Sequence, residues 1–254
     1  MPINPNFIDV DFARQPQFVK GDLGVRPGYA CAKYEDSIDV IPESKWKDEI
    51  AAMDAAGGGA DILVTRTYNQ RNEGSCVANA CSQANEIIQA KQFGKDRVVH
   101  LSAMSLYKRI GSGPNSGAMV SDGLDEMSSR GVLPLDDDAN KARFKHTMPN
   151  TGWTNRYPEG WEETAKLFRA TEWFIIESRA GLITALLNQH PVVVGRAGHS
   201  ICYCRPLYEG GRLLVKYKNS WGDWGDDGFG YDSENLIRSS SGWAFALRSV
   251  VVPN

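Results

Sequence analysis

QRNEGSCVANA, residues 70–80, decides how this chain folds, because a polar, glycine-containing turn here leads a cysteine into the first turn of a helix. From Cys76 onward, apolar residues recur at the three- and four-residue spacing of an amphipathic helix. They are Val77, Ala80, Cys81, Ala84, Ile87 and Ile88. We therefore predict a helix that starts at Cys76, with Ser75 as its N-cap and Gly94 as its end.

The position of Cys76 favours a reactive thiol. The first turn of a helix carries unpaired backbone N–H groups and the positive end of the helix dipole, which lower the pKa of a thiol and favour the thiolate. Cys81 lies about 140° around the same helix, at roughly 100° per residue, so the two thiols cannot share one face. We expect Cys76 to point outward and Cys81 to pack inward.

A nucleophilic thiolate needs a proton acceptor and a third group that orients this acceptor. Of the four histidines, His199 has the best surroundings, because it follows a flexible Arg-Ala-Gly turn and opens an apolar strand. The others are His100, His146 and His190. In YKNSWGDWGDDGFGY, residues 217–231, Asn219 ends an alternating strand and offers a side-chain oxygen to an imidazole N–H. Trp221 could shield that hydrogen bond from water.

NQRNEGSCVANA, GHS and KNSWGDWGDDGF, in this order, resemble the motifs of the papain-like cysteine peptidases. The resemblance implies that Cys76 is the nucleophile, His199 its acid and base partner, and Asn219 the residue that orients the imidazole. It also implies that Gln70 supplies a side-chain N–H to an oxyanion hole, beside the backbone N–H of Cys76.

The order of elements predicts an α+β protein, because helical patterns come first and strand patterns follow. Helices are expected within residues 41–59, 76–94, 120–130, 159–169 and 179–189. Strands are expected at DILVTRTY, PVVVG, HSICYC, RLLVKYKN and GWAFALRSVVV. The resemblance implies a papain-like architecture: a helical lobe and an antiparallel β-barrel-like lobe, with the active-site cleft between them.

Three departures from the family pattern carry information. Val77 follows the nucleophile where the family usually has an aromatic residue, which agrees better with bacterial or viral relatives than with lysosomal ones. Glu73 stands where secreted members often place a disulfide cysteine, which favours a reduced, non-secretory protein. The Trp-Gly motif after Asn219 is one residue shorter than the commonest spacing, which affects the expected loop geometry.

Residues 1–40 have little periodicity and are rich in Pro, Asn, Asp and aromatic residues, which predicts an extended arm. The peptidase-like domain is expected at residues 41–254. The arm is too short for the usual inhibitory propeptide of the family and lacks its helical pattern. Three roles fit the arm equally well: a short pro-segment over the cleft, a docking arm for a larger assembly, or a simple cover.

Composition excludes several classes of protein. The 254 residues are 42% hydrophobic and 23% charged, with a net charge of −3 and no long block of like charges, so nucleic acid is not an expected partner. No apolar run approaches the roughly 20 residues that span a bilayer, and the start of the chain lacks a signal-peptide pattern, so neither a membrane nor standard export is expected.

The cysteine pattern favours free thiols. Five cysteines are an odd number, scattered over a chain that does not need disulfide bonds, so we expect reduced thiols in a cytoplasmic or other reducing compartment. Cys202 and Cys204 have the wrong spacing for a common zinc site and are expected to be core thiols on one face of a strand. Neither a metal nor a cofactor is expected.

The leading hypothesis is a cysteine peptidase that acts on protein or peptide substrates through a thioester at Cys76. An alternative is a papain-fold structural or docking protein of a viral particle or secretion assembly, held through the arm. A third is a related hydrolase or transferase of cell-wall peptides or isopeptide bonds. Candidates for the pocket that reads the residue two before the scissile bond are Gly117, Ala118, Met119 and the stretch before His199.

Overall fold

The computed structural model describes residues 3–15, 17–239 and 243–251. The helices in these residues are α1 (Trp46–Ala55), α2 (Cys76–Phe93), α3 (Ala103–Ile110), α4 (Val120–Ser129), α5 (Asp138–Arg143), α6 (Glu162–Ala165), α7 (Arg179–Leu187) and α8 (Glu234–Ser239). The strands are β1 (Ala170–Ile176), β2 (Val192–Arg196), β3 (His199–Glu209), β4 (Arg212–Lys218), β5 (Phe229–Ser233) and β6 (Ala244–Val250). Short 3-10 helices are η1 (Pro5–Phe7), η2 (Phe12–Arg14), η3 (Glu43–Lys45), η4 (Ala60–Leu63), η5 (Lys95–Arg97) and η6 (Lys166–Phe168).

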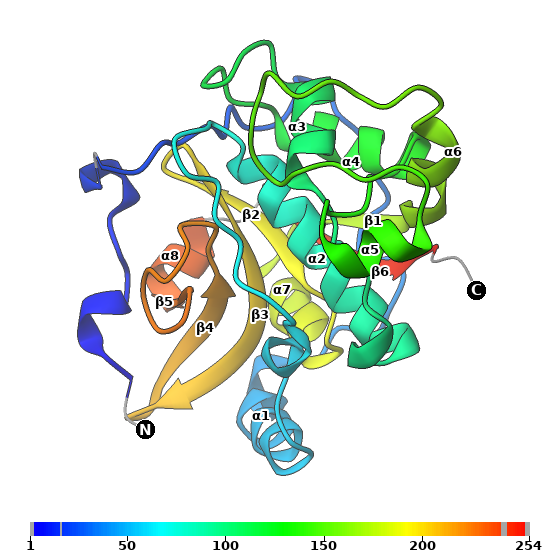
Figure 1. The fold of residues 1–254 in the computed structure, drawn as a ribbon. Helices are drawn as coiled ribbons and strands as arrows, with labels where there is room; N and C mark the ends of the chain where they lie inside the picture. The colour runs from blue at the N-terminus through cyan, green and yellow to red at the C-terminus, as the bar shows by residue number, and fades with distance from the viewer. Residues whose placement is uncertain (1–2, 16, 240–242, 252–254) are drawn as a thin grey trace.

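The six strands form one antiparallel sheet in the order β1-β6-β2-β3-β4-β5. Helix α2 packs against β2, β3 and β6 on one side and against α3 and α4 on the other, so it lies between the helical lobe and the sheet (Figure 1). The predicted α+β architecture, with a helical lobe and a β lobe, is confirmed.

Each face of the sheet has its own hydrophobic core, as the alternation of side chains along a strand requires. In β2, Val193 packs with α2, α3 and α4, whereas Val192 and Val194 pack on the opposite face with α1 and α7. Cys202 and Cys204 of β3 are fully buried and share the face of Val193. The prediction that these two thiols are core residues on one face of a strand is confirmed.

Helix α2 starts at Cys76 and ends at Phe93, and Gly94 follows it with a φ of 94°, as predicted. Ser75 occupies the N-cap position but its side chain does not cap the helix; its Oγ accepts a hydrogen bond from Asn79 instead. The helix is buried from its first residue to Ala90, polar side chains included. A helix buried on all sides is typical of the centre of a larger core.

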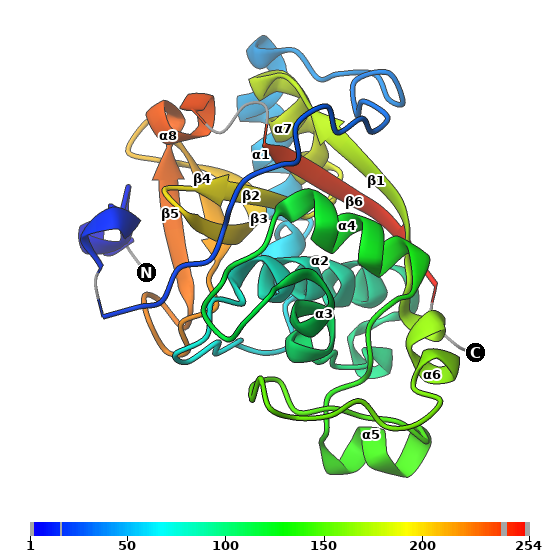
Figure 2. The ribbon, with the colours of Figure 1, turned by 90° about the horizontal axis from the view of Figure 1, so that it is seen from above.

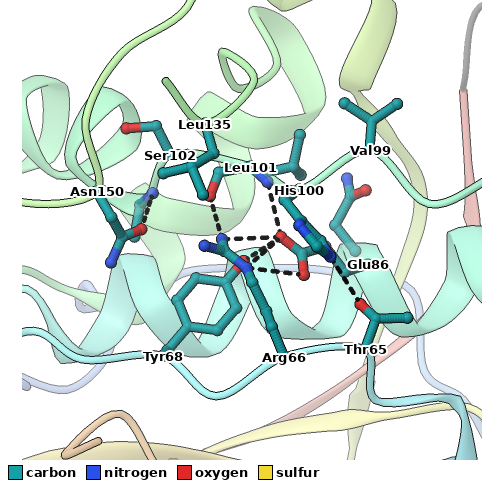
Figure 3. Close-up of polar contacts among 12 residues, drawn as sticks. Thr65, Arg66, Tyr68, Glu86, Val99, His100, Leu101, Ser102, Leu135 and Asn150 are labelled. Atoms are coloured by element: carbon teal, nitrogen blue, oxygen red, sulfur yellow. Dashed lines mark hydrogen bonds and ion pairs between the residues drawn. The ribbon is translucent and has the colours of Figure 1, made fainter. Parts of the chain in front are cut away.

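The predicted strand at DILVTRTY, residues 61–68, is wrong: the chain forms η4 and then continues extended without a ladder partner. Its polar side chains have tertiary partners instead. Asp61 pairs with Lys216 of β4, whereas Arg66 and Tyr68 both contact Glu86 of α2 (Figure 3). These partners hold the segment against α2, so its β-branched residues do not decide its conformation.

The other predicted helices and strands are found, some with shorter bounds. Helix α4 ends at Ser129, two residues before Gly131, which has a φ of 79°, and α7 ends at Leu187. The helix expected within residues 159–169 is only α6 followed by η6. Strands β1 and β5 were not predicted. Strand β5 contains Gly230 and Asp232, which are poor strand formers.

Residues 3–15 and 17–40 contain η1, η2 and a few turns, and between these they run extended along the molecule (Figure 2). Isolated bridges fix the path: Ile8 pairs with Tyr231 of β5, Asp22 with Ala118 before α4, and Lys33 with Ile175 of β1. The arm therefore crosses from the β lobe to the helical lobe and back to the opposite edge of the sheet. In the described part of the chain, none of the helices is long and apolar enough to cross a membrane.

Candidate active site

Cys76 lies at the first position of α2, but it is fully buried, as is Cys81. The expectation that Cys76 points outward is therefore wrong, because residues of the arm cover it. Burial raises the pKa of the Cys76 thiol to about 12, and the nearby carboxylate of Asp22 adds to the increase. Backbone N–H groups of Ser200, Gly21 and Val77 act in the opposite direction but have less effect. In this state the thiol is protonated, not a thiolate.

His199 and Asn219 meet at the end of two neighbouring strands. Strand β3 begins at His199, and its antiparallel partner β4 ends just before Asn219. The Nε2 atom of His199 lies 2.8 Å from Oδ1 of Asn219, which accepts the ring N–H. The Asn219 side chain is held in turn by the backbone N–H of Ser220, 2.7 Å from the same oxygen.

Aromatic rings enclose the imidazole of His199. The ring of Trp221 stacks on it with 4.4 Å between centroids, and Phe12 of the arm meets it edge-on at 5.0 Å. This burial lowers the pKa of His199 to about 3, although the hydrogen bond to Asn219 favours the charged form. Among the described residues, Nδ1 of His199 has no hydrogen-bond partner, so the imidazole and the Cys76 thiol are not joined in this state.

Gln70 is fully buried, and both ends of its amide are used. Its Oε1 accepts a hydrogen bond from the Ser220 hydroxyl at 2.6 Å, and its Nε2 donates to the carbonyl oxygens of Val19 at 3.0 Å and Glu73 at 2.8 Å. Ser220 thus contacts both Gln70 and Asn219. Sequence reasoning missed Ser220, although its place directly after Asn219 in the motif was a signal.

The arm crosses this site as an extended segment paired on both sides. On one side the backbone N–H groups of Gly21 and Asp22 donate to the carbonyl oxygen of Gly198, at 3.1 and 2.9 Å. On the other side the carbonyl oxygen of Gly21 accepts a hydrogen bond from the N–H of Ala118 at 2.7 Å. The N–H of Leu23 donates to the carbonyl oxygen of Ala118 at 3.0 Å. The segment therefore bridges the two lobes at the position of Cys76.

The fit around Gly21 leaves no space for a side chain. A Cβ atom at Gly21 would lie 2.0 Å from the carbonyl oxygen of Gly74, which is backbone and cannot rotate away. Gly117, which lies beside Gly74, has a φ of 72°, and a Cβ there would lie 2.6 Å from the carbonyl oxygen of Gly21. Glycine at both positions permits this close approach of three backbone segments.

Two phenylalanines anchor the arm beside the site. Phe12 is fully buried, packs against His199, Trp221 and Trp224, and lies 4.0 Å beneath the guanidinium of Arg196. Phe18 stacks on Trp221 with 4.3 Å between centroids and 7° between planes. Trp221, predicted to shield the His199 pair, also binds the arm.

Glu73 holds the wall of the site on the side of Gly117. Its carboxylate accepts hydrogen bonds from the backbone N–H groups of Gly152 and Trp153, both at 2.9 Å. The Trp153 ring packs edge-on against Tyr107, whose hydroxyl accepts from the N–H of Gly117 at 3.1 Å. A carboxylate therefore ties the loop at residues 152–153 to the turn before Cys76, at the position where secreted family members often have a cysteine.

The described residues hold no group of three or more His, Cys, Asp or Glu side chains that could bind a metal ion. All five cysteines are free thiols: Cys31, Cys76, Cys81, Cys202 and Cys204.

Comparison with solved structures shows that the fold is papain-like. Xylellain, a cysteine protease from Xylella fastidiosa, has 17% identity and a TM-score of 0.57 over 75% of this chain and 84% of its own. Procathepsin B S9 from Trypanosoma congolense has 11% identity and a TM-score of 0.63 over 96% of this chain and 90% of its own. Digestive procathepsin L 3 from Tenebrio molitor larval midgut has 15% identity and a TM-score of 0.58 over 75% and 67%.

No protein-family model and no curated protein matches the sequence. At the identities found, the likeness to solved structures establishes the fold alone. The matches span a bacterium, an insect and a trypanosome at similar TM-scores, so closeness to bacterial or viral relatives stays a prediction.

Proposed function

We propose that this protein is a cysteine peptidase that hydrolyses peptide bonds in protein or peptide substrates. The observation that most supports the proposal is the bond from Gln70 to the arm. Its Nε2 donates to the main-chain carbonyl of Val19 at 3.0 Å, so an amide donor beside Cys76 and the His199–Asn219 pair already binds a peptide carbonyl oxygen. Oxyanion-hole chemistry needs a donor of this kind at this place.

The proposed reaction has two steps. His199 accepts the proton of the Cys76 thiol at Nδ1, while Nε2–H stays bonded to Asn219, and the sulfur attacks the scissile carbonyl carbon. Gln70 and the backbone N–H of Cys76 bind the oxyanion. The amine leaves with the proton from His199, and a thioester remains. Water, deprotonated by His199, then attacks the thioester and releases the acid and the free thiol.

We also propose that residues 1–40 act as a pro-segment that blocks the cleft. Contacts at Val19, Gly21 and Phe12 favour this role over docking to an assembly, since they use the Gln70 donor and cover both Cys76 and His199. The docked segment is not a substrate, because the Gly21 carbonyl is bonded to the N–H of Ala118 and the thiol interacts with the Gly21 N–H.

Covalent capture by an epoxysuccinyl inhibitor of papain-type enzymes tests both proposals in the full chain. Gly21→Ala should release the arm, because its Cβ cannot fit against Gly74. We expect a single adduct on Cys76 in this variant, no adduct in the wild type, and none when Cys76→Ala is added. Gly113→Ala is the matched control, since a Cβ there meets nothing within 4 Å, and should behave as the wild type.

Labelling with iodoacetamide separates the two ways in which this experiment can fail. If Cys76 of the Gly21→Ala variant alkylates readily but gives no epoxysuccinyl adduct and hydrolyses no fluorogenic dipeptide, the arm is released and the peptidase proposal is overturned. If Cys76 stays as protected as in the wild type, the blocking role proposed for residues 1–40 is overturned instead.

A further inference from the structure

The side chain of Asp22 enters a small recess beside Cys76, between β2 and the start of β3. Its Oδ2 accepts a hydrogen bond from the Ser200 hydroxyl at 3.0 Å, and its Oδ1 accepts one from the backbone N–H of Gly24, within the arm itself, at 2.7 Å. The floor is the backbone of Gly195, where an added Cβ would lie 2.2 Å from Oδ2. The next residue, Leu23, is 58% exposed, so the recess receives one side chain of the extended segment while its neighbour faces solvent.

We propose that this recess, formed by Gly195 and Ser200, is a substrate subsite that selects a short side chain with a polar end, asparagine or aspartate. The inference rests on the proposed peptidase function and adds a substrate class to it. Asp22 reaches the recess through backbone pairing with Gly198 and Ala118, and these backbone groups are available to any extended peptide that replaces the arm.

The dimensions of the recess limit the length of the side chain. The carboxyl group of Asp22 already reaches the Gly195 backbone, and only the absence of a side chain at Gly195 leaves space for it. A side chain longer by a methylene group, such as that of glutamate or glutamine, would meet the backbone. The recess therefore accepts a side chain of the size of aspartate, asparagine or leucine.

Polarity then distinguishes asparagine and aspartate from leucine. The Ser200 hydroxyl can donate to a carboxylate or an amide oxygen and can accept from an amide N–H. Leucine would leave this hydroxyl, in a residue that is 1% exposed, without the partner it has with Asp22. Such a loss costs about tenfold in binding.

Among the residues that the structure describes, no cation contributes to the electrostatics of Asp22 in the recess. The titratable groups that face Asp22 are the thiols of Cys76 and Cys81 on α2, whereas β2 and β3 present Gly195 and Ser200. Accordingly, burial raises the pKa of the Asp22 carboxyl. A bound carboxylate thus takes up a proton more easily than a free one, so aspartate should bind better as the pH falls, whereas asparagine should not respond.

The first test uses the arm as the ligand and needs no catalysis. In the full chain, the rate of Cys76 alkylation at pH 8 measures how often the arm leaves the site, and Cys81 reports global unfolding. We expect Asp22→Asn to label no faster than the wild type and Asp22→Leu about tenfold faster or more. Ser200→Ala should accelerate labelling about tenfold in the wild-type chain and not in Asp22→Leu. Equal protection in Asp22→Leu and Asp22→Asn would overturn the subsite.

The second test uses substrates on the full-length Gly21→Ala variant. The substrates are fluorogenic dipeptides in which the residue at the scissile bond is the same throughout. The residue before it is asparagine, aspartate, alanine or leucine. We expect kcat/KM for asparagine to exceed that for leucine about tenfold, and Ser200→Ala to abolish this ratio. The aspartate to asparagine ratio should rise from pH 7.5 to pH 5. Hydrolysis of leucine in preference to both overturns the subsite but leaves the peptidase proposal intact. Hydrolysis of none, with the first test positive, overturns the peptidase proposal alone.

Discussion

At the residue scale, Cys76 experiences two opposite electrostatic influences. The first turn of α2 stabilises a thiolate, but burial beneath the arm raises the pKa of the thiol to about 12, so burial dominates. The effect of the helix N-terminus could be predicted from the sequence, because the local pattern of residues shows where the helix begins. The burial of Cys76 could not be predicted, because the residues that cover it are more than fifty positions away in the sequence. The four candidate residues could be predicted, but not their protonation states in the closed molecule.

Two buried histidines make the protein sensitive to acid. Burial lowers the pKa of His190 and of His199 to about 3, whereas an unfolded histidine titrates near 6.5. Between these values the unfolded chain binds more protons, so the free energy of unfolding decreases as the pH falls, by up to about 1.4 kcal/mol per pH unit for each histidine.

His190 allows this effect to be measured away from the candidate site. Its Nδ1 is 2.8 Å from the Tyr34 hydroxyl, and an asparagine can keep a polar atom at that position. We expect His190→Asn to lower the dependence of the unfolding free energy on pH by about 1 kcal/mol per unit between pH 6.5 and pH 4.5. Urea unfolding at three pH values checks this prediction. If the unfolding free energy of the variant depends on pH as steeply as that of the wild type, the prediction is contradicted.

At the element scale, α2 depends on buried polar contacts as well as apolar ones. Glu86 in its middle accepts hydrogen bonds from Arg66, from the Tyr68 hydroxyl and from the backbone N–H of Leu101 at 2.7 Å (Figure 3). The side chains of Arg66 and Glu86 are only 15% and 5% exposed. The sequence indicated the apolar face of this helix, whereas its polar face gave no sign that a carboxylate would be buried there.

Neutralising Glu86 should destabilise the fold, because it leaves a buried guanidinium without its counter-charge. We expect Glu86→Gln to lower the free energy of unfolding by about 3 kcal/mol. The control is Glu177→Gln in the exposed pair with Lys33, which should change it by less than about 0.5 kcal/mol. Urea unfolding at pH 7 measures both, and equal effects would contradict the prediction.

Strand prediction failed where tertiary partners outweigh local pattern. Residues 61–68 have β-branched and aromatic residues, but their polar side chains bind Lys216 and Glu86, so no ladder forms. Strand β5 shows the opposite case. Aspartate is rare in strands, yet Asp232 lies in β5. Its fully buried carboxylate pairs with Arg196 and accepts a hydrogen bond from the Tyr203 hydroxyl at 2.7 Å. Both outcomes depend on contacts between residues distant in sequence, which periodicity does not record.

At the scale of the whole molecule, the arm connects the two lobes. Its composition predicted an extended segment but left three roles equally open, because composition does not say which surface an extended segment covers. The contacts of Phe12, Val19 and Gly21 supply that information. They lie at the residues that the sequence motifs had already selected, Gln70, Cys76 and His199.

Phe12 should contribute much of the affinity of the arm for the site. It is fully buried against four aromatic rings, so Phe12→Ala should weaken docking by about 3 kcal/mol and accelerate Cys76 alkylation about a hundredfold. Leu23→Ala, in the same segment but 58% exposed, should change the rate by about twofold at most. Cys81 should stay unlabelled in both. Unchanged protection of Cys76 in Phe12→Ala would mean that the docked arm does not depend on this ring.

The carboxylate of Glu73 attaches one wall of the site by hydrogen bonds, which do not depend on redox conditions. A thiol such as Cys76 stays usable only where reductants keep it from oxidation, and the same reductants open strained or exposed disulfide bonds. Here the loop at Gly152 and Trp153 is fastened by two N–H groups that bind an anion, which no thiol reagent can reduce. Glutathione at a concentration that protects the sulfur therefore leaves the neighbouring wall in place.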